Sequence, residues 1–125
     1  MAGLQKILLV EDNAQLVDIY LLFLKQNGFD VATAMDGDQA LEVAKAYKPD
    51  LIFLDVMMPK KDGFEVLKLL RHEAQYNCVK AKIVLLTNLG DASKVSPQVH
   101  KDMDGYVIKA EIVLSDLLDI IKSLE

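Results

Sequence analysis

The sequence predicts one domain of the α/β class, built on a parallel β-sheet. Short apolar runs alternate along the chain with segments whose apolar residues recur at helical spacing, a pattern typical of βαβ units. Hydrophobic residues make up 52% of the 125 residues, which is enough for one core. Because we find no repeat, low-complexity segment or linker, we expect residues 1–125 to form a single domain.

Five strands are expected where β-branched, aromatic and other apolar residues follow one another in short runs. The clearest run is residues 51–54, because the turn-forming residues Pro59 and Gly63 follow it. In chain order, the expected strands are residues 6–10, 31–34, 51–54, 83–86 and 105–108.

Three helices are expected between the first four strands. The first, residues 13–27, ends before Gly28, a residue type that commonly terminates helices. The second and third, residues 36–47 and 63–72, are expected because their apolar residues recur at helical spacing. Those residues are Ala40, Leu41 and Ala44 in the second, and Phe64, Val66, Leu67 and Leu70 in the third.

The fourth helix is the least regular, because Pro97 lies within residues 91–102. A proline in a helix interior costs about 3 kcal/mol, whereas proline is favourable at the first helical position. Ser96 is a good N-cap residue, so we expect this helix to begin late, at Pro97, or to be kinked there. A fifth helix is expected over residues 112–124, because its apolar residues share one core-facing side; they are Val113, Leu117, Ile120, Ile121 and Leu124.

Polar residues stand where several of the expected strands end. They are Glu11 and Asp12 after the first strand, Asp55 after the third, Thr87 after the fourth and Lys109 after the fifth. The carboxyl ends of parallel strands lie along one edge of the sheet, where open α/β folds bind their ligands. We therefore expect three carboxylates, one hydroxyl and one ammonium group to converge at that edge.

The three carboxylates predict a cation site. Glu11, Asp12 and Asp55 would repel one another at close range, which raises carboxyl pKa values unless a cation neutralises the charge. Few protein ligands beside a phosphate-bearing partner favour Mg²⁺ over Ca²⁺. Taken singly, Asp12 or Asn13 is as readily explained as a cap of the first helix, but the grouping of all three acids favours the metal.

Asp55 is the candidate reactive group, because an aspartate carboxylate is a competent nucleophile toward phosphorus. Phosphoryl transfer depends mainly on neutralising the charge on the phosphoryl oxygens. Mg²⁺ and Lys109 would supply this neutralisation, and the Thr87 hydroxyl would hydrogen-bond a third oxygen. Thr87 and Lys109 are each unremarkable alone, but their joint occurrence in this order favours phosphoryl chemistry.

The chain resembles the receiver domain of two-component response regulators over essentially its whole length. The resemblance rests on an ordered set of motifs: Glu11-Asp12, Asp55 with Met57-Met58-Pro59 and Asp62-Gly63, Thr87, and Tyr106 with Lys109 three positions later. It implies a chemotaxis-regulator-like, doubly wound fold with helices on both faces of a sheet of strand order 2-1-3-4-5.

The resemblance also implies a role for each motif residue. Asp55 would accept a phosphoryl group from the phosphohistidine of a sensor histidine kinase or a phosphotransfer protein. Glu11, Asp12, Asp55 and the backbone carbonyl of Met57 would hold Mg²⁺. Lys109 would bridge to the carboxylate and then to the phosphate.

A switch is implied as well. Thr87 and Tyr106 would re-aim a partner-binding surface around the fourth helix, the fifth strand and the fifth helix. Such a domain is a signalling regulator and not an enzyme, although it assists its own phosphotransfer and dephosphorylation.

Three features depart from the family pattern. Ala110 follows Lys109 where the family usually has proline, and a cis bond before a non-proline residue costs about 2.5–4 kcal/mol, so we expect a trans bond or a strained exception. The segment 88–90 after Thr87 lacks the small residue often found there. The irregular fourth helix is the third departure, and all three lie where the family transmits its signal.

Other functional classes remain open. Haloacid-dehalogenase-like hydrolases also attack through aspartate but need a second aspartate two positions later, where this chain has Met57. A flavodoxin-like cofactor binder would need a Ser/Thr/Gly-rich loop after the first strand, where this chain has acids, and fold alone does not decide function. A receiver fold whose output is independent of phosphorylation is a further alternative.

Composition bounds the partners and the location. The net charge of −5 and a pI near 5.0 argue against direct binding of nucleic acid, which needs clustered lysine and arginine. The apolar stretch near the N-terminus is too short for a signal peptide or a membrane span.

The single Cys78 is expected to be a partly buried free thiol. We expect a cytoplasmic protein that is a monomer or a weak, phosphorylation-dependent dimer.

Overall fold

The computed structural model describes residues 5–87, 95–109 and 113–125. Its five strands are β1 (Lys6–Val10), β2 (Asp30–Ala34), β3 (Leu51–Asp55), β4 (Lys82–Thr87) and β5 (Gly105–Ile108). Its helices are α1 (Ala14–Gln26), α2 (Gly37–Tyr47), α3 (Gly63–His72), the short 3₁₀ helix η1 (Ala74–Tyr76), α5 (Pro97–Asp102) and α6 (Leu114–Leu124).

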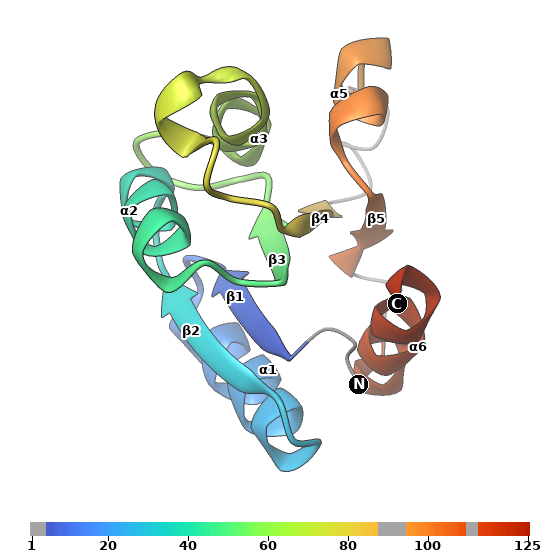
Figure 1. The fold of residues 1–125 in the computed structure, drawn as a ribbon. Helices are drawn as coiled ribbons and strands as arrows, with labels where there is room; N and C mark the ends of the chain where they lie inside the picture. Colours follow the sequence, from blue (N-terminus) through green and yellow to red (C-terminus); the bar gives the residue numbers. More distant parts are fainter. Residues whose placement is uncertain (1–4, 88–94, 110–112) are drawn as a thin grey trace.

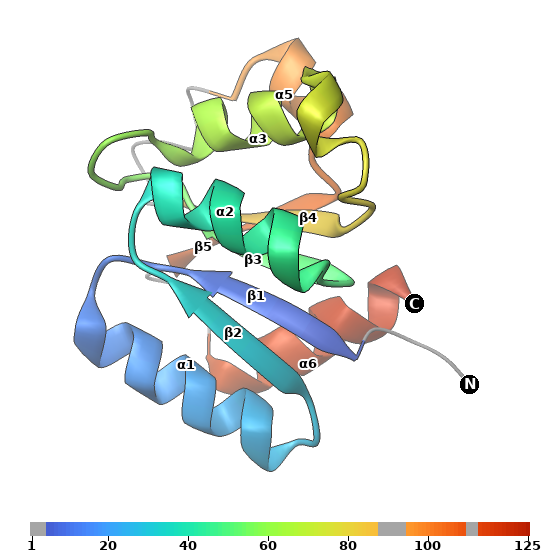
Figure 2. The same ribbon diagram turned by 60° about the vertical axis from the view of Figure 1, so that its left-hand side comes forward.

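The strands form one parallel sheet in the order β2-β1-β3-β4-β5, which confirms the predicted order. Helices α2, α3 and α5 cover one face, and α1 and α6 cover the other (Figures 1 and 2). The strands meet their expected bounds to within one residue at each end. The chain is therefore a doubly wound α/β domain over the residues that the structure describes.

Alternate residues of the central strands feed two separate cores, one on each face of the sheet. In β3, Ile52 and Leu54 pack beneath α2 and α3, whereas Leu51 and Phe53 pack against α1 and α6. All of β3 is buried, as expected of a parallel strand covered on both faces. The same alternation in β1 and β4 buries the middle of the sheet on both faces.

The helix ends follow the expected capping chemistry. The Asn13 side chain accepts hydrogen bonds from two backbone N–H groups in the first turn of α1, so Asn13 and not Asp12 caps that helix. Ser96 caps α5, and Pro97 occupies its first turn, as predicted. The late start leaves α5 six residues long, and none of them is buried.

Two expectations are wrong at the level of single side chains. Cys78 is exposed and not partly buried, because the loop before β4 turns its neighbours Val79 and Ala81 inward instead. Val113 precedes α6 and is 62% exposed, so the core-facing residues of this helix include Leu114 and not Val113.

Three expectations fall on residues outside the described ranges. They concern the Lys109–Ala110 peptide bond, the segment 88–90 and the first residues of the fifth helix at 112. None of the described helices is long and apolar enough to cross a lipid bilayer.

Candidate functional site

Strand register brings the polar residues to one edge of the sheet. Val10 pairs with Leu54, so Glu11 and Asp55 are the next residues on two adjacent strands. Thr87 pairs with Ile108 at the ends of β4 and β5, and Lys109 follows directly. The predicted convergence of the three carboxylates and the Lys109 ammonium is confirmed, and Thr87 ends β4 at the same edge of the sheet.

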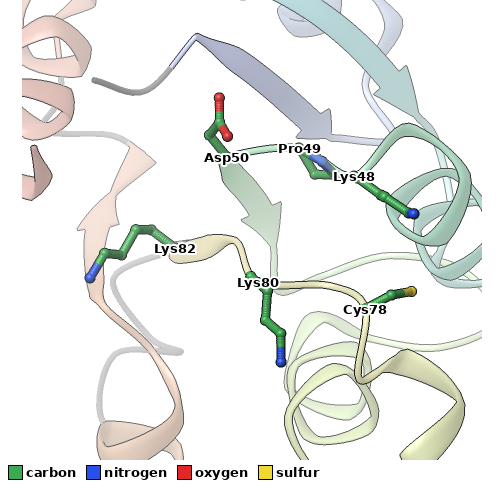
Figure 3. Close-up of a pocket in the computed structure, with 6 residues that line it drawn as sticks. All are labelled: Lys48, Pro49, Asp50, Cys78, Lys80 and Lys82. Carbon is green, nitrogen blue, oxygen red and sulfur yellow. The ribbon is translucent and has the colours of Figure 1, made fainter. Parts of the chain in front are cut away.

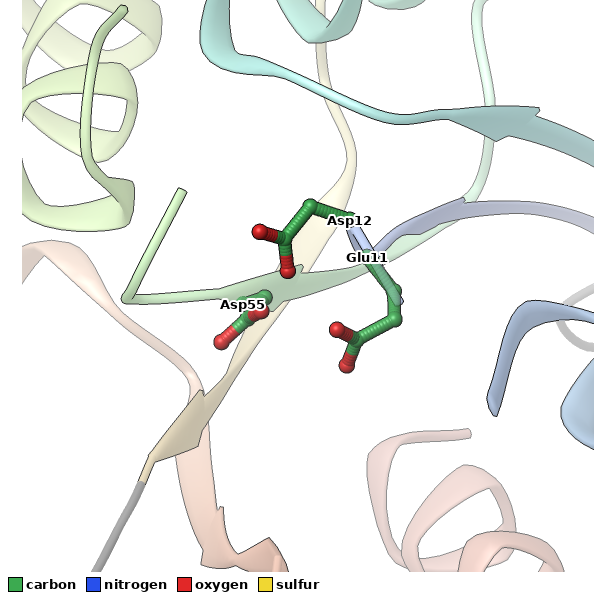
Figure 4. A group of neighbouring side chains, drawn as sticks. All are labelled: Glu11, Asp12 and Asp55. Carbon is green, nitrogen blue, oxygen red and sulfur yellow. The ribbon is translucent and has the colours of Figure 1, made fainter. Parts of the chain in front are cut away.

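Glu11, Asp12 and Asp55 form a compact acidic cluster (Figure 4). One carboxylate oxygen from each residue lies within 4.8 Å of the others. Glu11 and Asp55 are buried, whereas Asp12 is exposed. The cluster therefore opens to solvent on the Asp12 side and is closed beneath by the sheet.

Lys109 contacts two of these acids from β5. Its Nζ lies 2.7 Å from Glu11 Oε1 and 3.4 Å from Asp55 Oδ2. The sequence predicted the contact with the reactive aspartate, but the shorter ion pair is with Glu11. One ammonium group thus faces three carboxylates, so the site retains an excess of negative charge.

The electrostatics of the two buried acids differ. Burial, followed by the nearby negative charge of Glu11, raises the pKa of Asp55 to about 7. Burial also acts to raise the pKa of Glu11, but hydrogen bonding with Lys109 and Asp55 outweighs it and the net pKa is lowered. Of the two buried acids, Asp55 is therefore the one whose negative charge is less well neutralised by its surroundings.

A short loop holds the Asp55 carboxylate from the side of α3. The backbone N–H of Met57 donates a hydrogen bond to Asp55 Oδ1 at 3.2 Å. A Cβ on Gly63 would overlap the Asp55 backbone carbonyl oxygen, so only glycine fits where α3 begins. Gly63 of the Asp62-Gly63 motif thus makes a close backbone contact beneath the Asp55 side chain.

Thr87 ends β4 at the carboxyl edge of the sheet, and Tyr106 lies in the neighbouring strand β5. Thr87 is fully buried, and its hydroxyl donates to the backbone carbonyl of Val107 at 3.4 Å. Tyr106, the residue before Val107, is 42% exposed and on the surface. Thr87 is therefore hydrogen-bonded to the residue that follows Tyr106, so the backbone of β5 connects the two predicted switch residues.

The donor set fits a hard divalent cation. All three clustered side chains offer oxygen, and one of them is open to solvent, which suits an ion that keeps several of its waters. The raised pKa of Asp55 has a physical cause that such an ion would remove. Lys109 would remain on the Glu11 side of the cluster.

Two contacts of the site were not visible in the sequence. Asn13 donates its backbone N–H to Glu11 Oε2 at 3.2 Å, and the Val107 carbonyl accepts the Thr87 hydroxyl. The charges of the site also act on Tyr20 of α1. Burial, opposed by Lys109, raises the pKa of the Tyr20 hydroxyl. Each contact joins elements far apart in the chain or uses a backbone atom, so residue types alone carry no signal for it.

A separate pocket opens at the opposite edge of the sheet. It is lined by Lys48, Pro49, Asp50, Cys78, Lys80 and Lys82. Figure 3 shows that the three lysine side chains point away from one another, so they do not form a convergent anion site. The chemistry of the described residues is concentrated at the carboxyl edge.

Comparison with known proteins agrees with this geometry. The model of the response regulator receiver domain family matches residues 7–122. The alkaline phosphatase synthesis transcriptional regulatory protein PhoP of Bacillus subtilis is 51% identical over 69 residues, which cover 55% of this chain and 29% of that protein. The DNA-binding response regulator MtrA of Mycolicibacterium paratuberculosis is 35% identical over 105 residues, which cover 84% of this chain and 44% of that protein.

A solved structure shows the same fold. The response regulator protein TrrA from Thermotoga maritima, in complex with Mg(2+)-BeF, superposes with a TM-score of 0.81 at 29% identity and covers 97% of this chain and 99% of that one. This chain spans less than half the length of the two curated relatives. With the family model matched over nearly all of its length, the chain belongs to the response regulator receiver domain family.

Proposed function

We propose that this receiver domain is a phosphoacceptor switch in which Asp55 takes a phosphoryl group from a phosphohistidine. The observation that carries the proposal is the position of the buried Asp55 carboxylate. It belongs to an acidic cluster that opens to solvent, and it also lies near the ammonium group of Lys109. The pKa of Asp55 is also raised, because burial and the charge of Glu11 destabilise its ionised form. Perturbed carboxylates of this kind concentrate at functional sites.

The chemistry follows from the groups present. A carboxylate oxygen of Asp55 attacks phosphorus, the phosphorus–nitrogen bond of the phosphohistidine breaks, and the ring nitrogen leaves with the electron pair. Lys109 neutralises charge on the acyl phosphate, and the Thr87 hydroxyl donates to one of its oxygens. Met57 lies where a hydrolase would need an acid/base aspartate, so the acyl phosphate persists long enough to signal.

Glu11, Asp12, Asp55 and the backbone carbonyl of Met57 would hold Mg²⁺. When bound, the ion supplies charge neutralisation for the phosphoryl oxygens. The clustered oxygens and the Mg(2+)-BeF complex of the related TrrA protein support this assignment. The same charge neutralisation would also let the domain assist its own dephosphorylation.

The switch would begin at Thr87. In the unphosphorylated state its hydroxyl donates to Val107, through a hydrogen bond that is long and therefore weak. A phosphate oxygen on Asp55 offers a stronger, charge-assisted acceptor. Thr87 would turn toward it, Tyr106 would move inward from the surface, and a surface formed by α5, β5 and α6 would change.

Partners follow from this chemistry. The phosphodonor would be a sensor histidine kinase or a phosphotransfer protein, and the switched surface would engage a downstream protein. The relatives include DNA-binding regulators, but the net charge of −5 argues against nucleic-acid binding by this chain itself. A cytoplasmic location, and a monomer that dimerises weakly on phosphorylation, remain predictions.

The deciding experiment is incubation with acetyl phosphate and MgCl₂, followed by intact-mass measurement. The wild type should gain one phosphoryl group that is labile to hydroxylamine, as expected of an acyl phosphate. Asp55→Asn should gain none, while the exposed helical control Asp18→Asn should match the wild type. Stoichiometric phosphate on Asp55→Asn would show that another residue is the acceptor.

A further inference from the structure

We propose that the N-terminus of α2 positions the loop after Asp55 and thereby sets the orientation of the Asp55 carboxylate. The loop comprises residues 56–62 and joins β3 to α3. Its positioning residues are Gly37 and Asp38 on α2 and Lys61 within the loop. The inference rests on the proposed function, because the orientation of Asp55 matters for Mg²⁺ binding and for phosphoryl transfer.

Both ends of the loop are fixed against Asp55. Met57 donates its N–H to Asp55 Oδ1 at 3.2 Å. At the other end, Gly63 donates its N–H to the Val56 carbonyl at 2.8 Å and lies too close to the Asp55 backbone for any Cβ. A shift of the loop would therefore move the hydrogen-bond donor of the reactive carboxylate.

The middle of the loop rests on α2. A Cβ on Gly37 would overlap the backbone carbonyl oxygen of Lys61, so the two segments touch backbone to backbone. The Lys61 Nζ also lies 2.8 Å from Asp38 Oδ1. The adjacent Lys60 has a φ of 69°, a left-handed conformation uncommon for residues with a Cβ, and its Nζ lies 3.7 Å from Asp36 Oδ2.

The start of α2 is itself anchored to the site from the other side. The Asp36 side chain accepts the N–H of Gln39, and Gln39 Oε1 accepts the N–H of Met35, each at 2.9 Å. Ala34 accepts the backbone N–H of Glu11 at 3.1 Å. One continuous set of contacts thus runs from Glu11 through the α2 N-terminus and the loop to Asp55.

The first test is Gly37→Ala in the full chain. Its Cβ must displace the Lys61 backbone, and small displacements of reacting groups cost up to about a hundredfold in rate. We expect the rate of phosphorylation by acetyl phosphate to fall about ten- to a hundredfold, and the Kd for Mg²⁺ measured by NMR titration to rise. Circular dichroism at the assay temperature confirms that the variant is folded.

Gly105→Ala is the matched control. A Cβ at Gly105 would meet only Val84 Cγ2, at 4.0 Å, which is an ordinary van der Waals contact. This variant should keep the wild-type rate and Mg²⁺ affinity. A Gly37→Ala protein that melts at a lower temperature but retains both values would overturn the inference, because Gly37 would then be merely structural.

The second test is a charge-reversal cycle at two surface residues, which also decides the question if Gly37→Ala does not fold. Asp38→Lys and Lys61→Asp each place like charges opposite each other, and each should raise the Kd for Mg²⁺ about two- to fivefold by loosening the loop. The double variant restores the pair and should recover most of the loss.

Simple electrostatics gives a different pattern. If only the net charge near the metal mattered, Lys61→Asp would tighten Mg²⁺ binding, and the two single effects would add in the double variant. That outcome would overturn the inference while leaving the proposed function intact. Failure of the wild type itself to bind Mg²⁺ or to take up phosphate would overturn the proposed function instead.

Discussion

Asp55 is an acid whose ionised form is strongly destabilised by its position in the folded protein. Its carboxylate is buried beside Glu11, and its pKa is raised to about 7 by burial and by that neighbouring charge. Lys109 offsets only part of this effect, because its closer partner is Glu11. In the metal-free protein, ionised Asp55 therefore opposes folding.

The raised pKa of Asp55 predicts that the stability of the metal-free protein depends on pH. The pKa of Asp55 is higher in the folded than in the unfolded state, so between about pH 4 and 7 the folded state retains a proton that the unfolded state has lost. The contribution of Asp55 to stability should fall as the pH rises through this window, by an amount on the order of 4 kcal/mol.

Asp55→Asn isolates this contribution, because it removes the titrating group and keeps the shape. Urea unfolding in EDTA should show that the variant gains stability over the wild type as the pH rises. The pKa of Glu11 is lowered from 4.5, so its contribution to stability changes only up to about pH 4.5, and the raised pKa of Lys109 acts well above pH 7. The comparison is therefore made between about pH 5 and 7, where Asp55 alone of the three titrates. Parallel pH profiles for the two proteins would contradict the prediction.

Thr87 allows the switch to be separated from the chemistry. Thr87→Val keeps the branched shape of a buried side chain but removes the hydroxyl that donates to Val107. Because that hydrogen bond is long, we expect a loss in stability of about 1 kcal/mol or less. Phosphorylation at Asp55 should continue, while the change that it causes in hydrogen exchange of β5 should be lost.

Thr87→Ser, which retains the hydroxyl, is the control for this variant and should preserve the phosphorylation-dependent change in β5. An undiminished response of β5 in Thr87→Val would show that the signal leaves Asp55 by another route.

At the scale of elements, α5 is held by polar contacts with α3 and by one partly buried residue, Val99, that packs against the core. None of its six residues is buried. Arg71 of α3 donates to the carbonyls of Asp102 and Ala81 and to Asp104 Oδ2, and His72 Nε2 lies 2.9 Å from Asp102 Oδ2. His72 is half exposed, and its ring is paired with Asp102 at the end of α5.

These contacts predict that α5 opens locally before the rest of the domain. Its amides should exchange faster than those of α6, which buries Leu117 and Ile121. Arg71→Met should accelerate exchange in α5 further and lower global stability by about 1–3 kcal/mol, because the carbonyls of Asp102 and Ala81 lose the Arg71 donor and Asp104 keeps only the Ile83 N–H and the more distant Lys82.

Lys25→Met, at an exposed position of α1 on the other face of the sheet, should leave exchange in α5 unchanged. Hydrogen exchange followed by mass spectrometry separates the two helices. Equal protection of α5 and α6 would show that α5 is held by more than the contacts described.

At the scale of the whole molecule, a metal ion held by the acidic cluster would couple binding to folding. A cation that binds only the folded state stabilises it by mass action, about 2.7 kcal/mol at a hundredfold excess over Kd. Thermal melts at neutral pH should therefore shift upward with MgCl₂ in the wild type. Asp12→Ala should lose most of this shift, because Asp12 is the solvent-exposed member of the cluster.

NaCl matched for ionic strength serves as the control, since it screens charge without supplying a divalent ion. Equal shifts in NaCl and MgCl₂, or equal MgCl₂ shifts in the wild type and Asp12→Ala, would contradict a specific site.

The sequence by itself determined the order of elements and the residues of the site. The five apolar runs predicted the strands, and the polar residues after them converged because parallel strands share one carboxyl edge. Even the late start of α5 followed from one residue, since Pro97 lacks the N–H that a helix interior requires. These features depend on local conformational preference and on periodicity along the chain.

Only the tertiary structure decided which partners these residues have. It paired Lys109 most closely with Glu11, gave Thr87 the Val107 carbonyl, set Gly37 against Lys61 and left Cys78 exposed. Each outcome depends on the distance between elements, which is fixed by how helices pack on the twisted sheet. Residue type and spacing along the chain do not encode that distance, so the contacts that tune the site became visible only in three dimensions.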